Sequence, residues 1–320
     1  MPSIANLKLR MYITLALIFG IGFGIIYAVL YLIGVSLIGI LAFVLIFFVA
    51  QWYISPSIIA ISARLRYLKD DEHKEIQDMV KELSNRAGVP MPRIAISPSK
   101  EPNAFVFGRT KKSATLVLNQ GILDILNKDE LESVIGHELG HIKHNDFLVM
   151  TIVSFIPMLA YILAQNMIFS GNRSRNNDYA IFIGFAGFAV YFLSELLIMG
   201  LSRSREYFAD IHSANLTKKP EHLARALAKI TYNIAQNPSQ NASGAMRSFY
   251  IADAFNAKKD MEEIEKHADE LKKLLPEIEL RRFKSLAAKE DKNIMGLFMT
   301  HPPTYKRILT LARINRENKK

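Results

Sequence analysis

The 320-residue chain contains no cysteine, which excludes structural disulfides and every zinc site built on cysteine thiolates. It also lacks a run of basic residues interleaved with aromatic side chains, the pattern of a surface that stacks nucleic-acid bases. The formal net charge of +10 therefore does not indicate a nucleic-acid partner. Retention of Lys and Arg on the cytosolic side of a membrane, together with attraction to anionic lipid, explains this charge.

Four stretches of the chain are almost free of charged side chains, although 22% of all residues are charged. They cover residues 11–34, 35–60, 147–169 and 180–200, and the last contains one carboxylate, Glu195. Each reaches the roughly 20 residues that cross a bilayer, and none has the polar stripe of a long helix buried in a soluble protein. We therefore predict four transmembrane helices. Glu195 is expected to face protein or water, or to lie near the interface, without a catalytic role.

The distribution of Lys and Arg predicts the orientation of these helices. The first stretch is too long for a cleaved signal peptide, so we expect a retained anchor. Basic residues precede the first stretch and follow the second and fourth: Lys8, Arg10, Arg64, Arg66, Lys69, Arg203 and Arg205. The link between the third and fourth stretches carries Arg173 and Arg175 against Asp178, which weakly favours the opposite orientation. We expect a multi-pass protein of the cell (inner) membrane with both termini in the cytosol.

The predicted helices divide the chain into four parts. Residues 1–60 hold two N-terminal transmembrane helices, and residues 147–200 form a transmembrane hairpin. Residues 61–146 form a cytosolic half-domain, and residues 201–320 form a second, helical one. We expect the two cytosolic parts to form the functional domain together.

The first cytosolic part has the pattern of a small sheet beside helices. Apolar residues at helical spacing predict a helix over residues 70–86, and a second helix is predicted over residues 128–144. Short runs of β-branched and aromatic residues predict strands at 93–97, 103–108 and 114–119. A polar turn joins the last two strands, which favours a hairpin.

Residues 103–108 are the candidate edge of this sheet. A free edge can pair with an extended peptide, which predicts that Asn103, Ala104 and Phe105 bind substrate. The alternative is an ordinary hairpin strand in which Phe105 and Phe107 pack into the protein. The pattern fits both.

His137-Glu138-Leu139-Gly140-His141 is an H-E-x-x-H pattern within the predicted helix over residues 128–144. Positions i and i+4 lie on one face of a helix, so both imidazoles can reach one metal ion. The carboxylate of Glu138, next to the first imidazole, can act as a general base on a water molecule. This is the arrangement of a zinc peptidase. The alternative is an exposed helix that happens to carry two histidines.

A metal site of this kind needs a third protein ligand. A histidine six residues beyond His141 is absent, because Phe147 stands there. His144 can share the helix face, but three ligands from one straight helix rarely converge on one ion. Glu206, after the fourth apolar stretch, is the better candidate, and Asp210 one turn later can orient a ligand imidazole.

The spacing of His141 and Glu206 supports this choice. His141 lies six residues before the third apolar stretch, and Glu206 lies six residues after the fourth. Six helical residues rise about 9 Å. If both helices continue past the bilayer as an antiparallel pair, these two residues stand at about the same height above the membrane.

These residues together resemble the HtpX-type membrane zinc metalloproteases, which are relatives of the type I CAAX prenyl protease. The motifs that carry the resemblance are Asn103-Ala104-Phe105, His137 to His141, Arg203-x-x-Glu206-x-x-Ala209-Asp210, and His301-Pro302-Pro303 followed by Arg307. The resemblance implies that His137, His141 and Glu206 bind zinc and that Glu138 is the base. It also implies that His301 steadies the oxyanion and that Arg203 and Asp210 brace the site.

The charged segment of residues 257–291 is expected to form solvated amphipathic helices, with a substrate lid as the less favoured alternative. Relatives that process prenylated peptides have more membrane helices than the four predicted here, which argues against a prenylated substrate.

The predicted fold is an α-helical membrane protein with four transmembrane helices and a mainly α (α+β), gluzincin-like zinc peptidase domain. The predicted activity is a membrane-bound zinc metalloendopeptidase with one Zn²⁺ per chain. By the resemblance, it cleaves membrane or misfolded proteins at the cytosolic face in quality control and stress response. Its expected partners are polypeptides, membrane proteins among them, and the lipid bilayer. The alternative function is a non-catalytic, four-span zinc-binding scaffold or a transporter.

Overall fold

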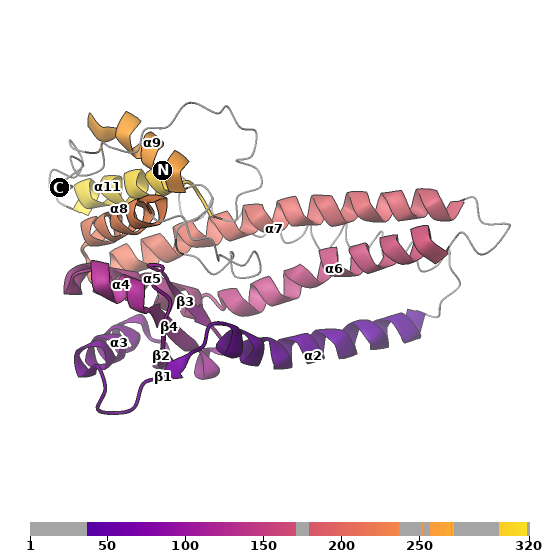
Figure 1. Ribbon diagram of the computed structural model, residues 1–320, viewed down its shortest axis with the longest axis horizontal. Helices are drawn as coiled ribbons and strands as arrows, with labels where there is room; N and C mark the ends of the chain where they lie inside the picture. The colour runs from indigo at the N-terminus through magenta and orange to yellow at the C-terminus, as the bar shows by residue number, and fades with distance from the viewer. Residues whose placement is uncertain are drawn as a thin grey trace. The chain divides into compact units, whose positions relative to one another are not determined.

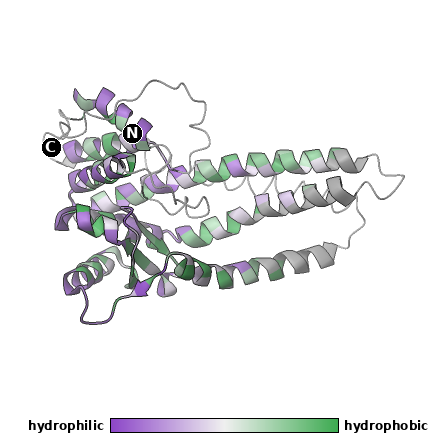
Figure 2. Ribbon diagram, viewed as in Figure 1, coloured by the Kyte–Doolittle hydropathy of each residue, from purple (hydrophilic) through white to green (hydrophobic). Residues whose placement is uncertain are grey.

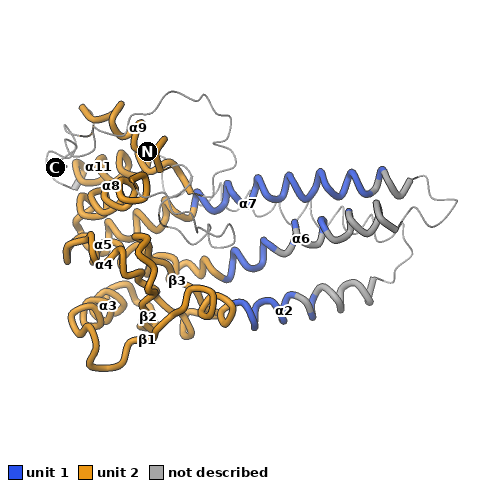
Figure 3. The backbone as a smooth tube through the Cα atoms, viewed as in Figure 1, with its two compact units in different colours: residues 1–55, 148–204 blue, residues 56–147, 205–320 orange. Residues whose placement is uncertain are grey.

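The computed structural model describes residues 37–170, 179–236, 251, 257–269, 271 and 301–318. The predicted first membrane helix at 11–34 and residues 270 and 272–291 of the charged segment lie outside these ranges. The chain divides into two compact units, coloured separately in Figure 3. Unit 1 comprises residues 1–55 and 148–204, and unit 2 comprises residues 56–147 and 205–320.

Three long helices cover the other predicted membrane segments (Figure 1). They are α2 (Leu37–Ser62), α6 (Asp146–Ser170) and α7 (Tyr179–Thr217). Within unit 1, α6 and α7 pack together through Val153, Ile156, Ile198 and Leu201. This packing is consistent with the predicted hairpin of residues 147–200.

Among the described residues, one segment is long and apolar enough to cross a membrane, Gly184–Thr217 within α7. Phe48–Ser62 at the end of α2 is a shorter apolar helix. Figure 2 shows the hydrophobic colour along α7 and the mixed colours of the helices in unit 2. Four transmembrane helices remain a prediction.

Unit 2 contains a four-stranded sheet in the order β1-β2-β4-β3. The strands are β1 (Arg66–Tyr67), β2 (Arg93–Ser97), β3 (Ala104–Phe107) and β4 (Thr115–Asn119). β3 and β4 form the predicted antiparallel hairpin, joined through the 3-10 turn η1 (Lys111–Ser113). β2 pairs with β4 in parallel. The predicted strands are confirmed, and β3 is an edge strand of the sheet.

Both faces of the hairpin are buried, because side chains alternate between the two faces of a strand. Ala104 and Val106 of β3 belong to the main core with Leu116 and Leu118 of β4. Phe105 and Phe107 point to the other face, where residues 59–65 at the end of α2 pack against them. The interpretation of Phe105 and Phe107 as packed residues is therefore confirmed.

The helices of unit 2 surround the main core (Figure 1). They are α3 (Lys74–Ala87), α4 (Gln120–Ile125), α5 (Lys128–Lys143), α8 (Pro220–Gln236), α9 (Ala257–Lys266) and α11 (Thr304–Asn318). α5 packs against α3 and α8, and α8 packs against α9 and α11. The helices predicted over 70–86 and 128–144 are thus confirmed as α3 and α5.

Local sequence signals explain where α5 begins and ends. The side chain of Asn127 accepts a hydrogen bond from the backbone N–H of Glu130, and the Glu130 carboxylate accepts one from the N–H of Asn127. At the other end, Asn145 adopts a left-handed backbone with φ 55°, which separates α5 from α6. The helix is therefore interrupted four residues beyond His141.

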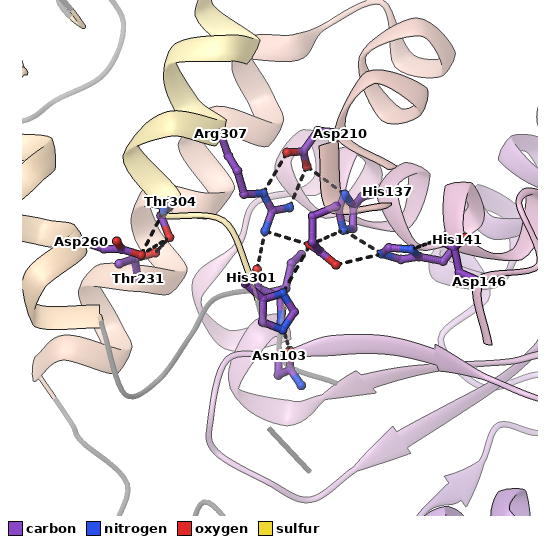
Figure 4. Close-up of polar contacts among 12 residues, drawn as sticks. Asn103, His137, His141, Asp146, Asp210, Thr231, Asp260, His301, Thr304 and Arg307 are labelled. Atoms are coloured by element: carbon purple, nitrogen blue, oxygen red, sulfur yellow. Dashed lines mark hydrogen bonds and ion pairs between the residues drawn. The ribbon is translucent and has the colours of Figure 1, made fainter. Parts of the chain in front are cut away.

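The N-terminus of α11 is capped by a carboxylate from a different helix. Asp260 of α9 accepts hydrogen bonds from the backbone N–H of Thr304 at 3.0 Å and from its hydroxyl at 2.8 Å. The hydroxyl of Thr231 in α8 donates to that of Thr304 at 3.3 Å. These three side chains lie together in Figure 4 and are all buried. The start of α11 is therefore fixed to α8 and α9.

Candidate metal centre

α5 brings the two histidines of the H-E-x-x-H pattern together, and α7 adds a carboxylate. The Nε2 atoms of His137 and His141 are 3.2 Å apart. Glu206 places Oε2 at 3.5 Å from Nε2 of His137 and Oε1 at 3.6 Å from Nε2 of His141. The ligand atoms of the three residues lie within 4.8 Å of one another. These side chains therefore form a group that can hold a metal ion.

The distances suit a small tetrahedral ion. For metal–ligand bonds of about 2.1 Å, two ligands of a tetrahedral site stand about 3.4 Å apart. The three distances between the ligand atoms of His137, His141 and Glu206 range from 3.2 to 3.6 Å and so lie on both sides of this value. Two neutral imidazoles and a carboxylate are also a donor set that Zn²⁺ accepts. The residues therefore fit the metal that the H-E-x-x-H pattern indicates.

Two small residues let α5 approach α7 closely. A Cβ atom added at Gly140 would lie 3.1 Å from Cα of Ala209, and one at Gly136 would lie 3.2 Å from Oγ of Ser213. The Ser213 hydroxyl also donates a hydrogen bond to the carbonyl of Ser133 at 2.6 Å. This close packing brings the carboxylate of Glu206 within 3.6 Å of both histidines.

The far side of His137 faces a second carboxylate. Its Nδ1 lies 3.0 Å from Oδ1 of Asp210, one helical turn beyond Glu206 on α7. Burial lowers the pKa of His137, but the carboxylates of Asp210 and Glu206 outweigh it and raise the pKa to about 9. The surroundings of His137 thus favour positive charge, which a divalent cation between the two imidazoles would supply.

His141 has its own carboxylate partner, which the sequence analysis missed. Nδ1 of His141 donates a hydrogen bond to Oδ2 of Asp146, the first residue of α6, at 2.5 Å. Oδ1 of Asp146 lies 3.0 Å from Nε of Arg205. Burial raises the pKa of Asp146, but Arg205 and His141 outweigh it and hold the pKa below its usual value. A carboxylate five residues after the second histidine was the available signal.

Arg307 of α11 joins the carboxylates of α7. Its Nε and Nη2 donate to the two oxygens of Asp210 at 2.8 and 2.7 Å, and its Nη1 lies 3.1 Å from Oε2 of Glu206. Arg307 is fully buried, with 1% of its surface exposed. Burial raises the pKa of Glu206, but the charges of His301 and Arg307 reverse this and hold the pKa well below its usual value. The sequence analysis named Arg307 only as part of a motif.

Glu138 is buried next to the two histidines, with 3% of its surface exposed. Burial raises its pKa, and the neighbouring charges of His141 and His137 lower it. A raised pKa brings a carboxylate closer to the range in which it can both accept and release a proton. The side chain therefore has the environment of a general base.

His301 lies just before α11 and is also buried. Its Nδ1 is 3.6 Å from Oε2 of Glu206, so its ring borders the three-residue group (Figure 4). It belongs to a segment that the capped start of α11 holds in place. An imidazole at this position can stabilise negative charge that develops near the metal centre.

Asn103 connects the edge strand to this region. In Figure 4 it lies beside His301. Its Oδ1 accepts a hydrogen bond from the backbone N–H of Ile251 at 2.9 Å, and Nη1 of Arg307 donates to the carbonyl of Ile251 at 2.6 Å. The side chain of Phe105 points to the end of α2, and Ala104 belongs to the main core. Substrate binding by Asn103, Ala104 and Phe105 stays a prediction.

Arg203 and His144 were also candidates from the sequence. Arg307 binds Asp210, and the bracing role of Arg203 stays a prediction. The ring of His144 packs against Phe208 at 5.9 Å and against His212 at 6.0 Å between centroids. His144 is not a member of the described group that can hold a metal.

Comparison with known proteins identifies the family. The model of peptidase family M48 matches residues 70–315, which include all residues of the site. The chain belongs to peptidase family M48. It is 38% identical to a protease HtpX homolog of Methanothermobacter thermautotrophicus, over 72% of this chain and 88% of that protein. It is 35% identical to a protease HtpX homolog of Moorella thermoacetica, over 98% of this chain and 96% of that protein.

A solved structure supports the fold. The crystal structure of S. mikatae Ste24p is similar, with a TM-score of 0.53 at 19% identity. The similarity covers 95% of this chain and 65% of that protein. The resemblance to HtpX-type proteases and the prediction of a metallopeptidase are confirmed. With the apolar helix in α7, these findings support a membrane metalloprotease.

Proposed function

We propose that the chain is a membrane-bound, zinc-dependent endopeptidase that cleaves membrane or misfolded polypeptides at the cytosolic face in protein quality control. The observation that carries the proposal is the meeting of His137, His141 and Glu206 beside the buried carboxylate of Glu138. This combination supplies ligands and a base in one place, which a passive metal site does not require.

The three ligand residues would hold one Zn²⁺, and Asp210 would hold His137 with its Nε2 toward the ion. When bound, zinc supplies a Lewis acid that polarises a peptide carbonyl and makes a water molecule more acidic. Glu138 takes a proton from that water while the oxygen of the water attacks the carbonyl carbon. Glu138 then gives the proton to the leaving amine as the C–N bond breaks.

His301 would stabilise the negative charge that develops on the carbonyl oxygen during attack. It is buried and borders the ligand group at 3.6 Å from Glu206. A preorganised donor at such a position acts in surroundings with little water, where its effect is large. Arg307 would hold Asp210 and Glu206 in place and so keep the ligands aligned.

The edge strand β3 would bind the substrate backbone. An extended peptide can add to the edge strand of a sheet through main-chain hydrogen bonds, with little dependence on its sequence. This mode suits a protease that must accept many unfolded chains. Asn103, just before β3 and beside His301, would connect the bound peptide to the metal centre.

A chelator-reversible proteolysis assay tests the proposed function. The purified full-length chain in detergent is incubated with casein, then with a chelator, and then with added Zn²⁺. We expect cleavage, its loss, and its return. Glu138→Gln serves as the control for a contaminating protease. Cleavage that persists in the chelator, or that the Glu138→Gln preparation retains in full, would contradict the proposal.

A further inference from the structure

Each imidazole of the candidate metal centre contacts an aspartate, and each aspartate contacts an arginine. On one side the order is His137, Asp210, Arg307, and on the other it is His141, Asp146, Arg205. In both histidines Nδ1 faces the aspartate, and the two Nε2 atoms face each other at 3.2 Å. The second series, His141, Asp146 and Arg205, includes two residues to which the proposed function assigns no role.

The backbone between α5 and α6 brings Asp146 to His141. α5 ends at Lys143, and Asn145 adopts the left-handed region at φ 55° before α6 begins at Asp146. A continuous helix would place residues 141 and 146 on different faces, because five residues turn the chain by about 500°. The break at Asn145 instead lets the carboxylate return to the imidazole five residues earlier.

The contact with Asp146 determines which nitrogen of His141 is free to bind a metal. When Nδ1 donates its proton to a carboxylate, the neutral ring carries its lone pair on Nε2. That atom is the one that points at His137 and Glu206. The contact also helps to fix the plane of the ring, which packs edge-to-face against the ring of His137.

Arg205 connects the same carboxylate to α7. It is 8% exposed, and its Nε lies 3.0 Å from Oδ1 of Asp146. Arg205 immediately precedes Glu206, the ligand that α7 contributes. The ion pair between Asp146 and Arg205 therefore ties the segment after α5 to α7 directly beside the metal ligands of both helices.

We propose that Asp146 and Arg205 are positioning residues that fix His141 as an Nε2 ligand and hold Glu206 at ligand distance from it. The inference rests on the metal site of the proposed function. It assigns to this pair a share of the metal affinity, beyond its contribution to the fold. Partner carboxylates of this kind typically change metal affinity by about 10–100-fold when removed.

The test measures metal binding by the full-length chain in detergent. Zinc affinity is determined by competition with a chromophoric chelator, and the Co²⁺-loaded protein gives a visible absorption spectrum that reports ligand geometry. We expect Asp146→Ala to bind Zn²⁺ about 10–100-fold more weakly and to shift the Co²⁺ bands. Asp146→Asn keeps an acceptor of the same shape and should restore part of the affinity. Arg205→Gln should weaken binding by a smaller factor.

Glu130→Gln is the matched control. Glu130 is a buried carboxylate on the same helix as His141, with its own basic partner, Lys229, at 2.7 Å. It lies seven residues before His137, so about 10 Å along α5 separates it from the ligands. We expect this variant to lower the melting temperature while its zinc affinity and Co²⁺ spectrum stay those of the wild type.

The outcomes separate the inference from the function on which it rests. A loaded wild type together with an Asp146→Ala variant of unchanged affinity and spectrum would overturn the inference alone. Equal loss of affinity in Glu130→Gln would also overturn it, because the effect would then be one of general stability. A wild-type chain that binds no metal would overturn the proposed function and the inference with it.

Discussion

Arg307 donates two hydrogen bonds to the carboxylate of Asp210, from Nε at 2.8 Å and from Nη2 at 2.7 Å. The two residues are separated by 97 positions in the sequence, and both are buried. A paired geometry of this kind is available to a guanidinium and not to an ammonium group. It makes α11, the last described helix, part of the support of a metal ligand on α5.

Replacing Arg307 tests this support. Arg307→Lys keeps the charge but loses the paired geometry, so we expect it to destabilise the chain by about 1.5–3 kcal/mol. It should also weaken zinc binding, because Asp210 loses its position behind His137. Thermal unfolding in detergent and chelator competition measure the two effects. Arg316→Lys, an exposed position on the same helix, is the control and should change neither.

Glu138→Gln tests the assignment of the general base. The amide has the same shape but cannot accept the proton, so we expect kcat/KM to fall about 10²–10⁴-fold. The zinc content should stay at one ion per chain, because Glu138 is not among the three grouped ligands. Proteolysis of casein and elemental analysis measure these quantities. Activity close to that of the wild type would reject Glu138 as the base.

Glu206→Ala tests the third ligand. Removal of the only carboxylate in the described three-residue group should lower zinc occupancy well below one ion per chain and abolish proteolysis. His144→Ala is the matched variant, since His144 packs against Phe208 and His212 instead. We expect it to keep full zinc. The reverse pattern, with zinc lost in His144→Ala and kept in Glu206→Ala, would move the third ligand to His144.

The cap of α11 provides a prediction about stability. Asp260→Ala leaves the buried N–H and hydroxyl of Thr304 without their acceptor, which should cost about 1–3 kcal/mol. The start of α11 would loosen, and with it the segment that carries His301. We expect a lower melting temperature and reduced turnover. Asp269→Ala, an exposed position beyond α9, should behave as the wild type, and an equal effect of both changes would argue against the cap.

Local patterns were sufficient to predict much of the fold. Helical spacing of apolar residues indicated α3, and runs of β-branched and aromatic residues indicated β2, β3 and β4. The strand of two residues, β1, was not predicted, because it is too short to show any periodicity. The parallel pairing of β2 with β4 also carries no local signal, since it depends on how the chain crosses over between them.

In the candidate site too, the sequence predicted some residues and missed others. His137 and His141 share a helix face, and the spacing of Glu206 from its apolar stretch placed it near them. Asp146 was overlooked because its approach depends on one left-handed residue, Asn145, at the break between two helices. Arg307 was overlooked as a partner of Asp210 because their contact joins α7 to the end of the chain. Contacts of this range follow from tertiary packing and not from sequence spacing.

The most direct test of the central claim, that one metal ion is held jointly by α5 and α7, is an anomalous-scattering map at the zinc absorption edge from crystals of the full-length chain. We expect a single peak about 2.0–2.2 Å from Nε2 of His137, Nε2 of His141 and a carboxylate oxygen of Glu206. A zinc peak elsewhere, or one at the histidines with Glu206 turned away from it, would contradict the account.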